Sequence, residues 1–77
     1  MRAFSLVGVD GNAFYLMGYT AKALKTAGLR DKVDEMHKEA TAGDYNNLIT
    51  VCDKYVDMAN EKLHADGKLD DYEEDDE

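Results

Sequence analysis

The amino-acid sequence predicts a mainly helical fold: a compact three-helix domain over residues 1–65 with a short N-terminal β-strand, followed by an acidic tail over residues 66–77. Apolar residues recur at helical spacing in three separate stretches, and a glycine follows each stretch. The chain contains no proline, which suits helices that end at glycines. Because 77 residues are few for a self-sufficient core, we expect two copies to associate as a homodimer.

Residues 3–9, AFSLVGV, predict a short β-strand, because apolar residues alternate between two faces. Phe4 and Leu6 would face one way, and Val7 and Val9 the other. The backbone groups of a single strand need a partner. Either the strand pairs with the same strand of a second copy, or the segment lies extended across the helices. We expect the paired form.

The first helix is predicted over residues 13–27, with Asn12 as its N-cap and Gly28 directly after its end. The expected apolar face of this helix consists of Phe14, Met17, Ala21 and Leu24. Of these, Phe14 and Met17 are expected to enter the core.

The second helix is predicted over residues 31–42, with Asp31 as N-cap and Gly43 as terminator, and the third over residues 45–64, with Asp44 as N-cap. The apolar face of the second is expected to contain Leu29, Val33, Met36 and Ala40. That of the third is expected to contain Tyr45, Leu48, Cys52, Tyr55 or Val56, Ala59 and Leu63, widened by Ile49 and Val51.

The net charge of −8 is concentrated at the C-terminal end. Residues 66–77 hold eight acidic residues and one lysine, a net of −7, whereas residues 1–65 hold nine acidic and eight basic residues, a net of −1. Such a block is typical of a solvated, disordered tail. Alternatively, its carboxylates imitate the phosphates of nucleic acid and occupy a basic groove on another protein. The same charge argues against direct binding of DNA or RNA.

The stretch GVDGNAF, residues 8–14, resembles several ligand loops but lacks a required residue of each. No lysine follows Gly11 as in a phosphate-binding loop, and the third glycine of a dinucleotide-binding loop is missing. Asp10 would repel the phosphates that a nucleic-acid GXXG loop binds, and Phe14 stands where a calcium loop continues with ligands. We therefore expect a structural corner before the first helix.

No constellation of side chains predicts catalysis, a metal site or a cofactor. Cys52 lies on an expected apolar face, and neither His37 nor His64 has a partner at ligand spacing. Tyr15 and Tyr19, four residues apart on one helix, are a candidate partner-binding pair, because tyrosine combines an apolar ring with a polar group.

The stretches GVDGNAFYLMGYTAKALKTAG and ATAGDYNNLITVCDKYVD resemble a group of short proteins carried by bacteriophages and mobile elements. That group shares a VDGNAF-like start, a GDY-N-L-like middle and a polar end. The likeness covers residues 7–60 and excludes the acidic tail, and it carries over no catalytic residue. It implies a small accessory protein of the kind that inhibits host defence, anti-CRISPR proteins among them.

Taken together, the composition and the resemblance predict a non-enzymatic inhibitor that binds a bacterial defence nucleoprotein or nuclease stoichiometrically in the host cytoplasm. Its expected partner has a basic nucleic-acid-binding groove, and no membrane is involved. The expected contacts are Tyr15, Tyr19, Asp70, Asp71, Tyr72, Glu73, Glu74, Asp75, Asp76 and Glu77. One alternative is a sponge for an anionic nucleotide at helix N-termini, using Asn12 with Lys22 and Lys25 or Arg30 and Lys32. Another is a structural dimerisation protein.

Overall fold

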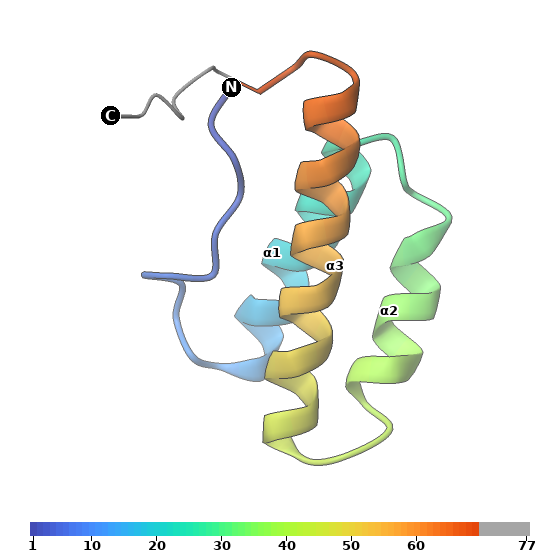
Figure 1. The fold of residues 1–77 in the computed structure, drawn as a ribbon. Coiled ribbons are helices and arrows are strands. Elements are labelled where there is room, and N and C mark those ends of the chain that lie inside the picture. The colour runs from blue at the N-terminus through green and yellow to red at the C-terminus, as the bar shows by residue number, and fades with distance from the viewer. Residues whose placement is uncertain (70–77) are drawn as a thin grey trace.

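The computed structural model describes residues 1–69, which form three helices: α1 (Ala13–Thr26), α2 (Lys32–Ala40) and α3 (Tyr45–Ala65). α1 and α3 run in the same direction and α2 in the opposite one, so the helices form an up-down-up bundle (Figure 1). Each helix contacts the other two. The predicted compact, mainly helical domain of three helices is confirmed.

The core lies along the middle of the bundle and takes side chains from all three helices. Leu24, Met36 and Leu63, one from each helix, are fully buried, and each contributes about 1.5–3 kcal/mol through removal of its apolar surface from water. The other buried apolar residues are Leu16, Ala23, Ala27, Ala40, Leu48, Val51, Cys52, Tyr55, Val56 and Ala59.

The prediction that Phe14 belongs to the core is wrong, because 81% of its surface is exposed. Successive helical residues are turned by about 100°, so Phe14 points almost opposite to the buried Leu16. Thr20 lies in the core instead, where its hydroxyl donates to the Leu16 carbonyl at 2.8 Å and is therefore satisfied. Tyr45 and Ile49, expected on the apolar face of α3, are also exposed.

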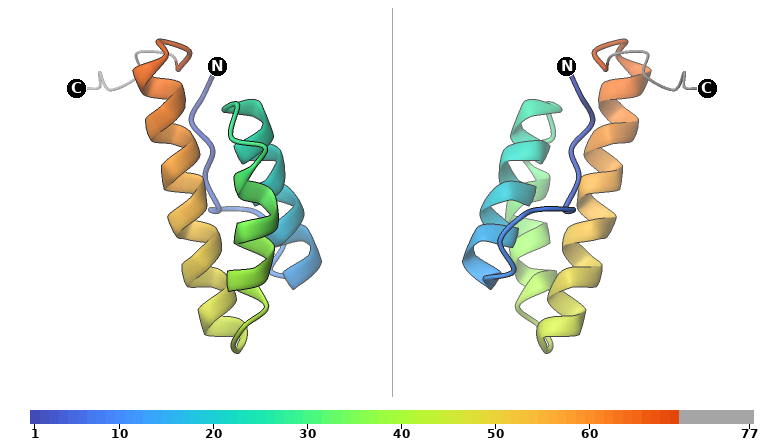
Figure 2. Two further views of the ribbon diagram at one scale, coloured as in Figure 1. Left: turned by 90° about the vertical axis from the view of Figure 1, so that its right-hand side faces the viewer. Right: turned by 90° about the vertical axis from the view of Figure 1, so that its left-hand side faces the viewer.

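Residues 1–69 contain no β-strand, so the strand predicted over residues 3–9 is wrong. Residues 1–11, the N-terminal segment, run beside α3 and then turn toward the start of α1 (Figure 2). The Asn60 side chain takes the place of a neighbouring strand: its Nδ2 donates to the Phe4 carbonyl and its Oδ1 accepts the Phe4 N–H, both at 2.8 Å. The Ser5 N–H donates to the Tyr19 hydroxyl at 2.7 Å. These backbone groups are satisfied within one chain, as the extended alternative requires.

The three predicted N-cap residues stand directly before their helices, and two of them make a side-chain cap bond. The Asn12 side chain accepts the Phe14 N–H at 2.8 Å, and the Asp44 side chain accepts the Asn47 N–H at 2.9 Å. Asp31 stands at the N-cap position of α2 as predicted, but its side chain makes no cap bond. Its backbone is already helical, with φ −68° and ψ −14°, whereas a capping residue usually has an extended backbone.

The glycines after α1 and α2 have different roles. Gly28 has a φ of 80° and ends α1 as predicted. α2 ends at Ala40, earlier than expected, and Gly43 has no positive φ, so its predicted role as helix terminator is wrong. A Cβ at Gly43 would lie only 2.9 Å from the Asn47 Cβ. Because Gly43 has no side chain, the turn can lie close to α3. There, Asn47 Nδ2 donates to the Glu39 carbonyl at 2.8 Å.

Candidate functional site

Tyr15 and Tyr19, the two tyrosines predicted to contact a partner, have different surroundings. Tyr19 is half-buried: its hydroxyl accepts the Ser5 N–H, and the Phe4 ring meets its ring edge-on at 5.6 Å between centroids. These contacts hold the N-terminal segment on α1. Tyr15, one helical turn earlier, is 61% exposed, so its ring remains accessible to another molecule.

The other predicted partner contacts belong to the acidic tail and lie outside the described residues. They are Asp70, Asp71, Tyr72, Glu73, Glu74, Asp75, Asp76 and Glu77. The tail's first acidic residue, Asp66, is described, and Lys62 Nζ binds its Oδ2 at 2.6 Å. This contact holds the pKa of the Asp66 carboxyl below its ordinary value. Asp66 is thus largely neutralised by a lysine of α3.

Three carboxylates form a row on the outer side of α3, which we call the acidic row: Asp53, Asp57 and Glu61. All three are exposed, and they recur at every fourth residue, so they follow one another along the helix at a rise of about 6 Å each. The ion pairs within residues 1–69 are Lys32 with Glu35, Lys54 with Glu39 and Lys62 with Asp66. None of them involves the acidic row, whose charge is therefore not neutralised by the described part of the chain.

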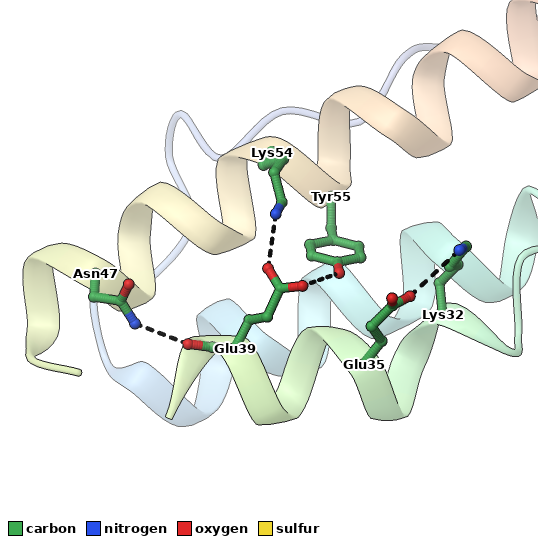
Figure 3. Close-up of polar contacts among 6 residues, drawn as sticks. All are labelled: Lys32, Glu35, Glu39, Asn47, Lys54 and Tyr55. Carbon is green, nitrogen blue, oxygen red and sulfur yellow. Dashed lines mark hydrogen bonds and ion pairs between the residues drawn. The ribbon is translucent and has the colours of Figure 1, made fainter. Parts of the chain in front are cut away.

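Two of the three carboxylates of α2, Glu35 and Glu39, are instead engaged with neighbouring side chains (Figure 3). Lys54 Nζ binds Glu39 Oε1 at 2.7 Å, and the Tyr55 hydroxyl donates to Glu39 Oε2 at 2.8 Å. Lys32 Nζ lies 3.3 Å from Glu35 Oε1. Glu39 thus ties α2 to α3 through both carboxylate oxygens.

The titration behaviour of Glu39 and Tyr55 follows from this contact. The hydrogen bonds from Lys54 and Tyr55 lower the pKa of Glu39 below its ordinary value. Burial, reinforced by the bond to the Glu39 carboxylate, raises the pKa of Tyr55 to about 12. Both groups therefore keep their ordinary charge at neutral pH, which fits a structural role.

The stretch GVDGNAF forms a corner between the N-terminal segment and α1. Asp10 Oδ1 accepts the Asn12 N–H at 2.8 Å. Asn12 in turn caps α1, because its Oδ1 accepts the Phe14 N–H. The Tyr45 hydroxyl, at the start of α3, donates to the Gly11 carbonyl. The beginnings of α1 and α3 therefore lie together and are occupied by their own caps, in agreement with the expectation of a structural corner.

The structure does not bring together the residues expected to hold a nucleotide signal. Asn12 lies at the start of α1, whereas Lys25 lies in its last turn. Arg30 and Lys32 follow at the turn into α2, the end of the bundle away from the starts of α1 and α3 (Figure 1). At the other end of the bundle, where α1 and α3 begin, α3 is capped by the carboxylate of Asp44, which would repel an anion.

Cys52 is fully buried, and burial raises the pKa of its thiol. The hydroxyl of its neighbour Thr20 donates its proton to the Leu16 carbonyl.

Within residues 1–69 no three His, Cys, Asp or Glu side chains gather at metal-binding distances, and this part of the chain has no helix long and apolar enough to cross a bilayer.

A surface that the sequence reasoning missed surrounds the N-terminal segment. Four large side chains there are exposed and form what we call the N-terminal face: Val7 at 91%, Tyr15 at 61%, Tyr45 at 48% and Ile49 at 38%. Tyr15 is one turn from Tyr19, which binds the segment, and Ile49 is one turn from Tyr45. The sequence shows the four-residue spacing within each helix, of Tyr15 and Tyr19 and of Tyr45 and Ile49. That the two pairs border one surface follows only from the path of the N-terminal segment.

Comparisons with protein-family models, with curated proteins and with solved structures find no match to this chain, so the resemblance of residues 7–60 to short phage proteins stays a prediction.

Proposed function

We propose that this protein is a non-enzymatic inhibitor that binds a bacterial defence nucleoprotein or nuclease stoichiometrically, with its acidic C-terminal end in place of nucleic acid. The proposal assigns the main contacts to residues 70–77, whose sequence adds seven carboxylates after α3. The target would be a protein with a basic groove, because affinity for nucleic acid depends largely on Lys and Arg meeting phosphates. The resemblance of residues 7–60 to phage accessory proteins supports the same class of function.

The observation that carries the proposal is the acidic row on α3. Within residues 1–69 the lysines Lys32, Lys54 and Lys62 neutralise other carboxylates and leave Asp53, Asp57 and Glu61 unpaired. The row lies on the helix that leads into the acidic tail. In the sequence, the unpaired carboxylates of the acidic row therefore precede those of the tail.

The spacing of the row bears on what it can imitate. Its charges follow at a rise of about 6 Å, compared with about 3.4 Å per phosphate along one strand of duplex DNA. The row alone supplies about half the charge density of a strand. The row would therefore be an extension of the contact rather than the whole of it, and the tail would carry most of the affinity.

Affinity capture from a bacterial host lysate, followed by mass spectrometry, tests the proposal. The full chain should retain a nucleic-acid-binding protein, duplex DNA should compete for it, and the capture should weaken steeply with salt because charged contacts dominate. A chain truncated after Leu69 should lose the partner. Neutralising the row by Asp53→Asn, Asp57→Asn and Glu61→Gln should weaken capture by a smaller factor.

The matched control neutralises three other carboxylates of the body, at the start of α2, by Asp31→Asn, Asp34→Asn and Glu35→Gln, and should leave capture intact. Equal capture by the truncated chain would contradict the role of the tail. Capture that duplex DNA cannot displace would contradict mimicry of nucleic acid. A nucleotide recovered from the purified protein would instead favour a sponge.

A further inference from the structure

The N-terminal face has a fixed shape, because the part of the segment from Phe4 to Gly11 is held at three points. Asn60 of α3 binds both backbone groups of Phe4, and Tyr19 of α1 binds the Ser5 N–H. The Tyr45 hydroxyl binds the Gly11 carbonyl. Phe4, Leu6 and Val9 pack against the core, whereas Val7 points outward and is 91% exposed.

The face combines apolar side chains with tyrosines, a composition typical of the centre of a protein interface. Val7, Tyr15, Tyr45 and Ile49 lie on it, all exposed within the described part of the chain. A domain of this length has little core of its own, so burial of such a face against another molecule would add substantially to its stability.

The two edges of this face carry opposite charges. On the α1 edge, Lys22 is turned by about 60° from Tyr19, the residue that binds the segment. On the α3 edge, Asp53 is turned by only about 20° from Asn60, which binds the segment from the other side. Both side chains are exposed, and neither forms an ion pair within residues 1–69.

Both charges lie in the middle part of the bundle. α1 and α3 run in the same direction, and α3 begins somewhat below α1 (Figure 1), where the Tyr45 hydroxyl reaches the Gly11 carbonyl. At 1.5 Å per residue, Lys22 lies about 13 Å beyond the start of α1 and Asp53 about 12 Å beyond the start of α3. The face is thus positive on one edge and negative on the other in the middle part of the bundle.

From this arrangement we propose that the N-terminal face is the interface of a homodimer, whose twofold axis lies parallel to the helices. Rotation about such an axis preserves height and exchanges the edges, so Lys22 meets the partner's Asp53, and the contact occurs twice. Tyr15 then meets the partner's Tyr45 and Ile49 near the start of the bundle. An axis perpendicular to the helices would bring like charges together instead. Because the dimer would use Asp53 of the acidic row, Asp57, Glu61 and the tail would remain for the proposed inhibition.

Sedimentation velocity of the full chain at low salt, over a range of concentrations, tests this interface. We expect a species of twice the 8.6 kDa chain mass, which dissociates on dilution. Lys22→Glu and, separately, Asp53→Lys should each weaken dimerisation at least about tenfold, because two attractive contacts become repulsive. Mixed in equal amounts, the two variants should dimerise again, because every charged contact of the heterodimer is attractive.

Matched controls separate the interface from general effects of charge and hydrophobicity. Lys25→Glu makes the same charge change as Lys22→Glu, but this residue is turned by about 120° from Tyr19, so the dimer should persist. Phe14→Asp removes a more exposed aromatic residue from another side of α1 and should also leave the dimer intact, whereas Tyr15→Asp should dissociate it. Circular dichroism verifies that each variant is folded.

Three results would overturn the proposal. The first is a wild-type chain that stays monomeric at every concentration. The second is a dimer that Tyr15→Asp and Lys22→Glu leave unchanged. The third is a mixture of the two charge variants that stays monomeric although each is folded, which would exclude the parallel twofold axis.

Discussion

Asn60 on α3 binds Phe4 through both polar atoms of its side-chain amide, at 2.8 Å each, across 56 residues of sequence. The amide offers a donor and an acceptor side by side, as the backbone of a neighbouring strand does. A single side chain therefore satisfies the two backbone groups of Phe4, and the N-terminal segment docks on a helix without joining a sheet.

Asn60→Ala should lower the free energy of unfolding by about 1–3 kcal/mol, the net worth of two hydrogen bonds. Urea denaturation measures the loss. Asn46→Ala, also on α3, is the control and should change stability little, because within residues 1–69 no hydrogen bond is made by the Asn46 side chain. Equal stability of the Asn60→Ala variant and the wild type would show that the other contacts of the segment suffice to hold it.

Asn12→Ala should lower stability by about 1 kcal/mol, because it removes the side-chain cap of α1. Asp31→Ala is the matched comparison at the start of α2. This substitution removes no capping bond. It should therefore lower stability by less than Asn12→Ala, through loss of a negative charge near the positive end of the helix dipole. Thermal denaturation of both variants ranks them, and a larger loss for Asp31→Ala would contradict the observed caps. The capture of a partner by folded Asn12→Ala protein should be unchanged.

Glu39 should make stability depend on pH on the acidic side. Lys54 and Tyr55 lower its folded-state pKa below the ordinary 4.5, so the contact stabilises the fold above the unfolded-state pKa. That contribution is lost as the pH falls through the folded-state pKa. Denaturant midpoints between pH 7 and pH 3 should fall less steeply for Glu39→Gln than for the wild type.

Two glycine substitutions should act in opposite directions. Gly43→Ala should destabilise the protein, because the new Cβ would lie 2.9 Å from the Asn47 Cβ and force the turn after α2 away from α3. Gly18→Ala should stabilise it by about 0.5–1 kcal/mol, since Gly18 lies within α1 and its Cβ would meet nothing within 4 Å. Chemical denaturation measures both changes, and destabilisation by Gly18→Ala would reveal an undescribed contact there.

The sequence predicted the parts of the fold that depend on near neighbours. The caps Asn12 and Asp44 act within three residues, and the helices follow apolar spacing over one or two turns. The error at Phe14 has a physical reason: its spacing to Met17 is helical, but the buried side of α1 centres on Leu16 and Thr20. A buried threonine satisfied by its own helix gives no hydrophobic signal.

The missed parts depend on contacts between distant segments. Residues 3–9 have a strand-like composition, and nothing near them indicates that Asn60 would satisfy their backbone. The N-terminal face is likewise assembled from Val7, Tyr15, Tyr45 and Ile49, which come from three regions of the chain. Of the expected contacts, Tyr15 is accessible, Tyr19 holds the segment, and residues 70–77 lie outside the described residues.

The long sequence separation between Phe4 and Asn60 also bears on the order of folding. The contacts between successive helices join residues that are closer in sequence than Phe4 and Asn60, and such contacts form earlier because less loop entropy opposes them. The N-terminal segment has to close a loop of 56 residues before Asn60 can bind it. It should therefore dock last on a preformed bundle and detach first, so the amide of Phe4 should exchange with solvent faster than those of α3.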